Sequence, residues 1–267
     1  MCSIDNNYNT VVATTYDSLP LYANRKDIQF YVDLCREVNG NVLELGCGTG
    51  RILVPVAMTG INIVGLDSSS HMLEQCRHHL NSQSEDTRTR IELVHSNMTN
   101  FELNRKFDLI IIPFRPFQHL ISIQEQVDCL KSVSKHLNEN GLLVFDLFQV
   151  NFYMLCNPQS SEETEDVPMC ALPDGKKLRR CSRIAQSHRA EQYNNVELIY
   201  YISDHNGLQE RHVQSFPLRY FFRYEVEHLL SRTGFSIVQL FGNFDKSPLC
   251  DDSPEMIFVA SKQTTYV

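Results

Sequence analysis

Short apolar runs alternate with amphipathic segments through the first 150 residues, and few folds accommodate this pattern. The apolar runs lie at 42–45, 61–66, 91–96, 107–113 and 142–148. Strands that are apolar throughout are typical of a parallel sheet covered by helices on both faces. The pattern therefore predicts an open, doubly wound α/β fold. In such folds the ligand site lies beyond the carboxyl ends of the strands, here near the first one.

Helical periodicity fills the intervals between these strands. Apolar side chains recur at spacings of three and four through residues 28–38, and an Asn-Gly pair at 39–40 ends this segment. The same pattern marks residues 52–57, 68–80 and 122–137. We expect the serines at 68–70 to cap one of these helices and a second Asn-Gly pair, at 140–141, to end the last one.

The alternation of strand-like and helical segments stops after residue 148. Residues 158–168 are mostly polar and acidic, residues 175–189 are rich in Lys and Arg, and we expect both to be solvated. Two runs typical of strands lie at 196–202 and 210–216. They flank an Asn-Gly pair at 206–207, which indicates a hairpin. We predict that residues 151–218 form an antiparallel β insertion on the ligand face, where it covers the bound molecule or pairs two subunits of a homodimer.

The α/β pattern resumes after the insertion. Residues 224–232 have helical periodicity, and Gly234 suits the left-handed residue that often follows a helix. Strand-like runs follow at 236–241 and 256–261 with no helix between them, so we expect the last strand to be antiparallel. The predicted parts are an α/β core with an N-terminal helical cap at 1–150, a lid insertion at 151–218 and the rest of the core at 219–267.

Composition limits the possible partners and compartment. Lys and Arg total 24 and Asp and Glu total 32, for a net charge of −8, whereas nucleic-acid-binding proteins usually carry a basic excess. No run approaches the ~18 apolar residues of a membrane span, and the N-terminus has no signal-peptide pattern. The nine cysteines form no CxxC pair, so their spacing is not that of a zinc site. We expect a reduced cytoplasmic protein without nucleic-acid or membrane partners.

The segment VLELGCGTGR at 42–51 carries the most specific signal. Its glycines follow the pattern GxGxG, whereas the dinucleotide fingerprint of dehydrogenases is GxGxxG and a phosphate loop requires GK[ST]. Glu44 lies within the preceding strand, and a buried carboxylate needs partners, which are either the amides of the loop or a cationic group of a ligand. Asp67 ends the second strand, where an acid can accept hydrogen bonds from both hydroxyls of a ribose.

These residues resemble the class I S-adenosylmethionine-dependent methyltransferases, because VLELGCGTGR is followed by VGLDSS at 64–69. The resemblance extends to SNM at 96–98, FDLIIIPFRPFQHL at 107–120, LLVFDLF at 142–148 and LRYFFRYEVEHLLSRTGF at 218–235. It implies a seven-stranded sheet with an antiparallel last strand and S-adenosyl-L-methionine as the cofactor. The insertion resembles the lid sheet of small-molecule methyltransferases such as glycine N-methyltransferase and the sugar N-methyltransferases, which implies a small-molecule substrate.

The resemblance also implies a set of cofactor-binding residues. They are Tyr16, Arg25, Glu44, Gly46, Cys47, Gly48, Gly50, Asp67, Ser68, Asn97, Met98 and Pro113. By this resemblance Asp67 binds the ribose. Asn97 stands where the family often has Asp, and it accepts a hydrogen bond from the adenine amino group through its amide oxygen. Met98 packs on the adenine or in the core. Arg25 pairs with the cofactor carboxylate and Tyr16 helps to close the site, or the two are a surface Arg and a packing Tyr.

A second set of residues is a candidate for catalysis and substrate binding. The substrate-binding candidates are Phe114, Arg115, Arg219, Asn243 and Asp245. The two arginines suit an anionic group, and Asp245 suits a cationic group or the cap of a turn. His119 follows the fourth strand and has the pKa range of a general base, or it only packs at the start of a helix. Asp146 has no evident partner acid, so we expect no metal site.

The sequence thus favours an enzyme that transfers a methyl group from S-adenosylmethionine to a nitrogen or oxygen of a small molecule by in-line displacement. Two alternatives remain open, a methyltransferase that acts on protein or RNA and an S-adenosylmethionine-binding protein without catalysis. A neutral amine can attack unaided, whereas a hydroxyl usually needs a base or a metal. We favour an amine, because no residue close to His119 in the sequence orients its ring.

Overall fold

The computed structural model describes residues 10–23 and 25–263, and these form two compact units. The α/β unit comprises Lys26–Gln149 and the described part of Phe221–Val267. The insertion unit comprises Val150–Tyr220 and the described part of Met1–Arg25. The N-terminal segment therefore groups with the insertion, whereas we expected it to cap the α/β core. In the part of the chain that the structure describes, no helix is long and apolar enough to cross a bilayer.

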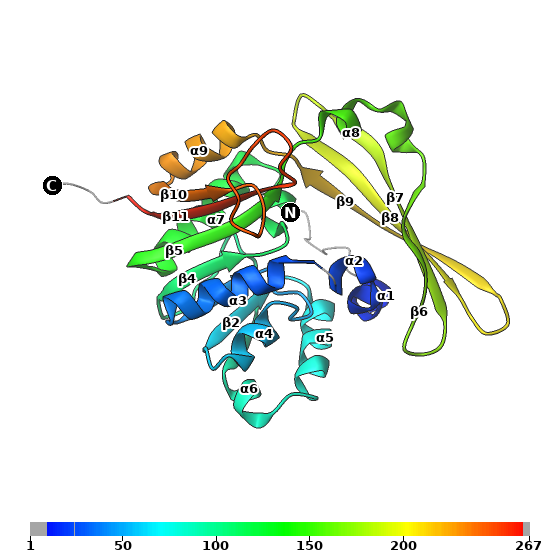
Figure 1. The fold of residues 1–267 in the computed structure, drawn as a ribbon, viewed down its shortest axis with the longest axis horizontal. Coiled ribbons are helices and arrows are strands. Elements are labelled where there is room, and N and C mark those ends of the chain that lie inside the picture. Colours follow the sequence, from blue (N-terminus) through cyan, green and yellow to red (C-terminus); the bar gives the residue numbers. More distant parts are fainter. Residues whose placement is uncertain (1–9, 24, 264–267) are drawn as a thin grey trace. The chain divides into compact units, whose positions relative to one another are not determined.

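The α/β unit is built on a seven-stranded sheet with the strand order β10-β11-β5-β4-β1-β2-β3 (Figure 1). Its strands are β1 Val42–Leu45, β2 Ile63–Asp67, β3 Ile91–His95, β4 Phe107–Ile112, β5 Leu137–Phe148, β10 Phe235–Phe241 and β11 Glu255–Lys262. Strands β3, β2, β1, β4 and β5 are parallel, and β11 is antiparallel to both of its neighbours. This confirms the predicted doubly wound sheet with an antiparallel last strand.

The helices of this unit begin and end at local signals. They are α3 Asp27–Val38, α4 Leu53–Met58, α5 Ser70–Leu80, α6 Glu85–Thr89, the 3-10 helix η2 Pro116–His119, α7 Ile123–His136 and α9 Arg223–Arg232. Ser69 caps α5 by accepting a hydrogen bond from the Met72 amide, which confirms the predicted serine cap. Ser122 and Glu125 form a capping box at α7. Gly234, with φ of +84°, is left-handed after α9, as expected.

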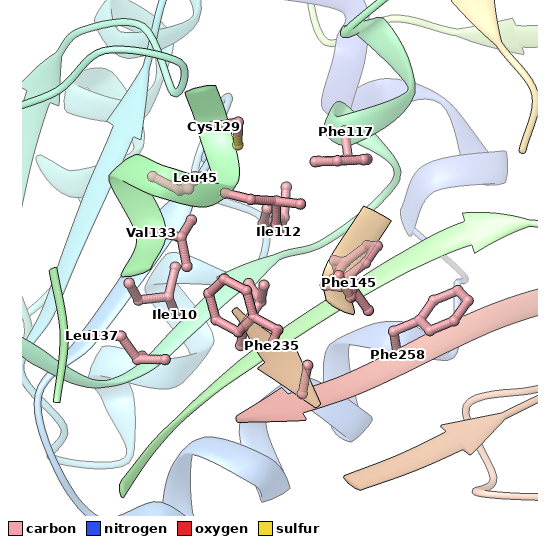
Figure 2. Close-up of a cluster of buried hydrophobic side chains, with 14 of the residues drawn as sticks. Leu45, Ile110, Ile112, Phe117, Cys129, Val133, Leu137, Phe145, Phe235 and Phe258 are labelled. Carbon is pink, nitrogen blue, oxygen red and sulfur yellow. The ribbon is translucent and has the colours of Figure 1, made fainter. Parts of the chain in front are cut away.

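The core lies on both faces of the sheet, because successive side chains of a strand point to opposite faces. In β4, Leu109 and Ile111 join a buried cluster with α3, α4 and α5, while Ile110 and Ile112 join another with α7 and α9. Figure 2 shows part of the second cluster, where Ile110 and Ile112 lie near Val133 of α7. Burial of a large apolar side chain stabilises a fold by about 1.5–3 kcal/mol, which explains why the central strands are mostly apolar.

One local prediction was wrong. Helix α7 ends at His136 and β5 begins at once, so the Asn-Gly pair at 140–141 lies inside the strand rather than after a helix. The strand starts early because Leu137 is buried and pairs with Phe107 of β4. Strand β3 has no fully buried residue, because it is the edge strand of the sheet and has a single neighbour, β2.

The insertion unit contains a four-stranded antiparallel sheet in the order β6-β7-β8-β9, as predicted (Figure 1). The strands are β6 Thr164–Ala171, β7 Lys177–His188, β8 Tyr193–Ser203 and β9 Gln209–Arg219. The remaining elements of the unit are α1 Thr10–Thr15, η1 Tyr16–Ser18, α2 Pro20–Ala23, α8 Phe152–Cys156 and η3 Pro158–Ser161. The predicted hairpin joins β8 to β9, where Gly207 has φ of +81° and Asp204 accepts hydrogen bonds from the Asn206 and Leu208 amides.

Among the charged side chains of the two runs, the expected solvation is wrong for Arg180. The Arg180 side chain in β7 is only 2% exposed. Its guanidinium donates to both carboxylate oxygens of Asp166 over 3.0 and 2.9 Å, and also to the Tyr22 hydroxyl. A buried arginine is tolerated because the bidentate carboxylate balances its charge. The acidic and basic runs thus form an ion pair between adjacent strands, in which the arginine is buried and the aspartate is partly exposed.

Candidate active site

The glycine loop follows β1 where the strand order reverses, with β2 on one side of β1 and β4 on the other. Glycines 46, 48 and 50 all have left-handed backbones, with φ of +76°, +53° and +91°. The Asp67 carboxylate at the end of β2 accepts a hydrogen bond from the Gly48 amide and another from the Ser69 amide, each 2.8 Å long. Asp67 therefore holds the loop and the start of α5 in one arrangement.

The three glycines differ in what surrounds them. A Cβ at Gly46 would lie 2.7 Å from Cγ of Pro116, and one at Gly50 would lie 2.8 Å from Sγ of Cys76. A Cβ at Gly48 would meet no atom within 4 Å. Gly46 and Gly50 are thus required by packing inside the protein, whereas Gly48 faces open space beside Asp67. This is the place in the loop that a ligand can approach closely.

Glu44 lies beneath the loop in β1 and is 2% exposed. Its Oε2 atom has no hydrogen-bond partner among the described residues. We expected the loop amides to be one possible partner, but the Gly48 amide donates to Asp67, and the amides of Gly46 and Cys47 donate to the Leu66 carbonyl. Burial raises the pKa of Glu44 well above its usual range, and the nearby Arg51 lowers it in part. The partner of this oxygen is therefore a polar group of a ligand or a water molecule.

The turn after β4 is strained and held by buried acids. Phe114 and Arg115 have φ of +65° and +72°, a backbone conformation that residues other than glycine rarely adopt. The Phe114 amide donates to Oδ1 of Asp146 over 2.8 Å, and the same oxygen accepts from the Tyr31 hydroxyl over 2.7 Å. Arg115 pairs with Glu255 at 2.6 Å. Strain of this kind persists only where surrounding contacts enforce it, and it is common at functional sites.

The side chain of Arg51 joins this turn to the glycine loop. Arg51, directly after the loop, makes two hydrogen bonds of 2.8 and 2.6 Å to Asp27 at the start of α3. The Arg51 guanidinium also lies 4.9 Å from the centre of the Phe114 ring, within the range of a cation–π contact. The loop after β1 and the turn after β4 are therefore connected by side-chain contacts.

The residues predicted to lie near the adenine occupy the loops after β2 and β3. Asn97 uses its amide oxygen within its own turn, where it accepts from the amide and the hydroxyl of Thr99, both at 2.9 Å. Met98 is half-buried, and its Cε would lie 3.7 Å from a Cβ at Gly46, so it borders the glycine loop. Ser68 is half-buried between Asp67 and the Ser69 cap. Their contacts with an adenine stay predictions.

The predicted substrate residues of the α/β unit already have partners within the protein. Arg115 is held by Glu255, as described above. Asn243 accepts a hydrogen bond from the Phe244 amide. Asp245 accepts one from the Ser247 amide, which together with the Ser247 hydroxyl lowers the pKa of this carboxyl, so Asp245 caps a turn. His119 is half-buried at the end of η2, and its role as a base stays a prediction.

Three predicted site residues belong to the insertion unit. The Tyr16 ring stacks on Tyr22, with centroids 4.3 Å apart. Arg219 is buried and donates to the Glu191 carbonyl over 2.9 Å. Arg25 is half-buried. The contacts of Tyr16 and Arg25 with the cofactor, and that of Arg219 with the substrate, stay predictions.

Sequence reasoning missed the residues that shape the site from below, namely Asp27, Tyr31, Arg51 and Asp146. One signal for Asp146 was present, because an acid inside the apolar run LLVFDLF is as unusual as Glu44 in VLEL. Nothing local marks Asp27 or Tyr31, which reach the site only because α3 packs on the sheet. Across residues 10–23 and 25–263, no three His, Cys, Asp or Glu side chains are grouped to hold a metal.

Known proteins share both the sequence pattern and the fold. Residues 42–141 match the family described as methyltransferase domain. A protein of Geobacillus sp. (strain WCH70) that is named as a methyltransferase is 24% identical over 252 residues, 92% of this chain and 93% of that protein. The structure of the CcbJ methyltransferase from Streptomyces caelestis has a TM-score of 0.76 at 20% identity, and covers 97% of this chain and 99% of its own. The sugar N-methyltransferase KedS8 from Streptoalloteichus sp. has a TM-score of 0.71 at 19% identity over 93% of each chain.

The family match spans the glycine loop, Asp67 and the strained turn after β4. The Geobacillus relative and the CcbJ structure extend the likeness beyond the α/β core to the insertion, since each covers more than nine-tenths of the chain. The likeness to solved structures concerns the fold, while the sequence relatives carry the methyltransferase name. Taken together, the family match over residues 42–141, these relatives and the shared fold support a class I S-adenosylmethionine-dependent methyltransferase.

Proposed function

We propose that this methyltransferase acts on a small molecule and transfers the methyl group to a nitrogen or an oxygen. The observation that carries the proposal is the open space at Gly48 beside the Asp67 carboxylate, in a chain that also carries the insertion sheet. KedS8, which has this fold over 93% of its chain, is a sugar N-methyltransferase. The net charge of −8 argues against RNA as the substrate.

The residues of the α/β unit fit the cofactor by their chemistry. The backbone at Gly48 allows close approach, and Asp67 is the acid that would take the ribose hydroxyls. Glu44 offers a buried oxygen without a partner. In our proposal Ser68, Asn97 and Met98 line the adenine, while Tyr16 and Arg25 of the insertion unit close over the cofactor. Bound S-adenosylmethionine supplies an electrophilic methyl group for in-line displacement.

The chain's own contribution is to position the acceptor and to exclude water. The strained turn presents Pro113 and Phe114, and it is held by Asp146 and by the Arg115–Glu255 pair. Because the turn is already ordered, it positions an acceptor without the cost of ordering a loop during the reaction. His119 takes a proton if the acceptor is a hydroxyl, and it serves for packing or positioning if the acceptor is an amine.

Cofactor binding is tested with a pair of glycine variants. Gly48→Val places a side chain where the cofactor would approach, and Gly60→Val is its matched control. Gly60 is also left-handed, with φ of +93°, and a Cβ there also meets no atom within 4 Å, so both variants carry similar backbone strain. We expect S-adenosylhomocysteine to raise the melting temperature of the wild type and of Gly60→Val but not that of Gly48→Val. Stabilisation by NAD but not by S-adenosylhomocysteine would contradict the proposal.

The substrate class is tested by following a labelled methyl group. The enzyme is incubated with S-adenosylmethionine labelled on its methyl group and with a cell extract separated into small-molecule, protein and RNA fractions. We expect the label to enter the small-molecule fraction and to be absent from it when Gly48→Val replaces the wild type. Label confined to protein or RNA would show that the substrate is a macromolecule.

A further inference from the structure

Strand β5 extends beyond its parallel neighbour β4 at the carboxyl end of the sheet. The β4–β5 ladder ends where Ile112 pairs with Phe145, and β5 continues to Phe148. A backbone amide beyond the ladder needs another partner, because buried amides are almost always paired. Residues 113–119, here called the acceptor turn, comprise the turn after β4 and the 3-10 helix η2. The contacts of the acceptor turn with β5 therefore decide how the chain leaves β4.

Two buried side chains join the acceptor turn to β5 in opposite directions. Asp146 of β5 is fully buried, and its Oδ1 accepts a hydrogen bond from the Phe114 amide over 2.8 Å. Gln118 of η2 is also fully buried, and its Oε1 accepts from the Phe148 amide over 3.1 Å. A side chain of the strand thus holds the backbone of the turn, and a side chain of the turn holds the backbone of the strand. Because the two contacts lie four positions apart, they fix the acceptor turn near both of its ends.

The apolar contacts of the acceptor turn do not fix it in the same way. The Phe117 ring packs on Phe145 of β5, with centroids 5.3 Å apart (Figure 2), and on Phe221, with centroids 5.6 Å apart. Apolar burial is non-directional, so it places the segment against the core without setting its orientation. Hydrogen bonds weaken steeply when donor and acceptor are misaligned. Asp146 and Gln118 therefore supply the orientation that apolar packing does not.

The conformation that these side chains hold is costly to the fold. Phe114 and Arg115 have consecutive left-handed backbones, and such strain persists only where surrounding contacts enforce it. Burial of the polar groups of Asp146 and Gln118 adds a desolvation cost that apolar side chains would avoid. The stability of the fold alone does not explain these residues, because apolar side chains and a relaxed turn would cost less. Strain of this kind is common at functional sites.

The acceptor turn also lies beside the glycine loop. A Cβ at Gly46 would lie 2.7 Å from Cγ of Pro116, so the two segments are in contact. Within the acceptor turn, Phe114 and His119 are half-buried, whereas Gln118 is fully buried. The hydrogen bonds to β5 thus fix a backbone that carries two partly exposed side chains next to the loop.

We propose that Asp146 and Gln118 are positioning residues for methyl transfer. They hold the acceptor turn so that Phe114 and His119 meet the methyl acceptor in line with the methyl group of the cofactor. Neither Asp146 nor Gln118 touches the acceptor, and both act through the backbone of the turn. This assignment rests on the proposed function, which places the acceptor at this turn. It adds the residues that control the rate of transfer rather than the affinity for the cofactor.

The first test measures amide hydrogen exchange of the full-length chain with S-adenosylhomocysteine present, by mass spectrometry. Asp146→Ala and Gln118→Leu each remove a hydrogen-bond acceptor, whereas Asp146→Asn keeps an oxygen that can accept from the Phe114 amide. Asp108→Ala is the matched control, because Asp108 accepts from the Asn41 amide over 2.9 Å at the amino end of β4.

We expect faster exchange in the acceptor turn of Asp146→Ala and Gln118→Leu, and wild-type exchange there in Asp146→Asn and Asp108→Ala. Gln118→Leu leaves no charged group unpaired, so it carries the test if Asp146→Ala does not fold. Wild-type exchange in Gln118→Leu and in a folded Asp146→Ala would show that the two side chains do not order the turn, and would overturn the assignment.

The second test separates the rate of transfer from cofactor binding. The probes are S-adenosylmethionine labelled on its methyl group and the small-molecule fraction of a cell extract, and the affinity for S-adenosylhomocysteine is measured on the same samples. We expect Asp146→Ala and Gln118→Leu to label the fraction about 10²-fold more slowly than wild type, because a misplacement of about 1 Å can cost that factor. Their affinity for S-adenosylhomocysteine should be unchanged, and Asp146→Asn and Asp108→Ala should keep the wild-type rate to within a few fold.

Three results of the second test would overturn the assignment. They are wild-type rates in Asp146→Ala and Gln118→Leu, equal losses of rate and of S-adenosylhomocysteine affinity, and a slow Asp146→Asn whose acceptor turn exchanges like the wild type. The last result would show that the charge of Asp146 acts directly and not through the turn. If the wild type itself labels no small molecule, the proposed function fails and the assignment fails with it, whatever the hydrogen exchange of the variants.

Discussion

Alanine in place of Gly50 should destabilise the fold more than alanine in place of Gly48, although both glycines have left-handed backbones. The left-handed conformation costs a residue with a Cβ about 1–2 kcal/mol, and this cost applies to both variants. At Gly48 the new methyl group meets no atom within 4 Å. At Gly50 it would lie 2.8 Å from Sγ of Cys76 and 3.4 Å from Cγ2 of Val54. Overpacking of a buried site costs about 1–3 kcal/mol more.

A double-mutant cycle isolates the packing contribution. Cys76 is fully buried, and Cys76→Ala removes the sulfur that the new methyl group would meet. The Gly50→Ala/Cys76→Ala variant should therefore lose about 1–3 kcal/mol less than the sum of the two single changes. Urea denaturation followed by circular dichroism gives the free energy of unfolding of each variant. Equal losses at Gly48 and Gly50, or additive losses in the double variant, would refute the view that Cys76 dictates the glycine at position 50.

Three further predictions concern the site. Tyr31→Phe removes the hydroxyl that donates to Asp146 and leaves a buried carboxylate with one partner fewer. This change should lower the free energy of unfolding, measured in urea, by about 1–3 kcal/mol. An unchanged free energy would mean that the hydrogen bond is dispensable. Burial raises the folded-state pKa of Glu44 well above its usual range near 4.5, so the stability that this group contributes is fully present below about pH 4.5 and declines as the pH rises toward the folded pKa. The melting temperature of Glu44→Gln relative to wild type should therefore rise between pH 4.5 and 8, and a constant difference would contradict a buried, proton-binding Glu44. His119→Ala should lower kcat by ~10²–10⁴ if the acceptor is a hydroxyl and should mainly raise KM if it is an amine, and pH–rate profiles of both enzymes on an identified substrate decide between the two.

The candidate site was partly predictable. The glycine pattern and Asp67 were predicted because the residues that mark them lie within a few positions of the ends of β1 and β2 in the sequence. The hydrogen bond from Asp67 to the loop was not predicted, since Glu44 was an equally reasonable acceptor for the backbone amides of the glycine loop. The Tyr31–Asp146 bond joins residues 115 positions apart, and its existence depends on how α3 packs against the sheet.

Local patterns in the sequence were sufficient to predict the strands of the core, the antiparallel last strand and the hairpin at 206–207, because side-chain periodicity and turn chemistry act over a few residues. Tertiary structure alone decided which charges are buried. Arg180 belongs to a run that reads as solvated, yet Asp166 on the next strand neutralises it. Likewise, Arg115 is held by Glu255, 140 positions away. Such pairings follow from strand register and helix packing, which bring together groups that no local pattern relates.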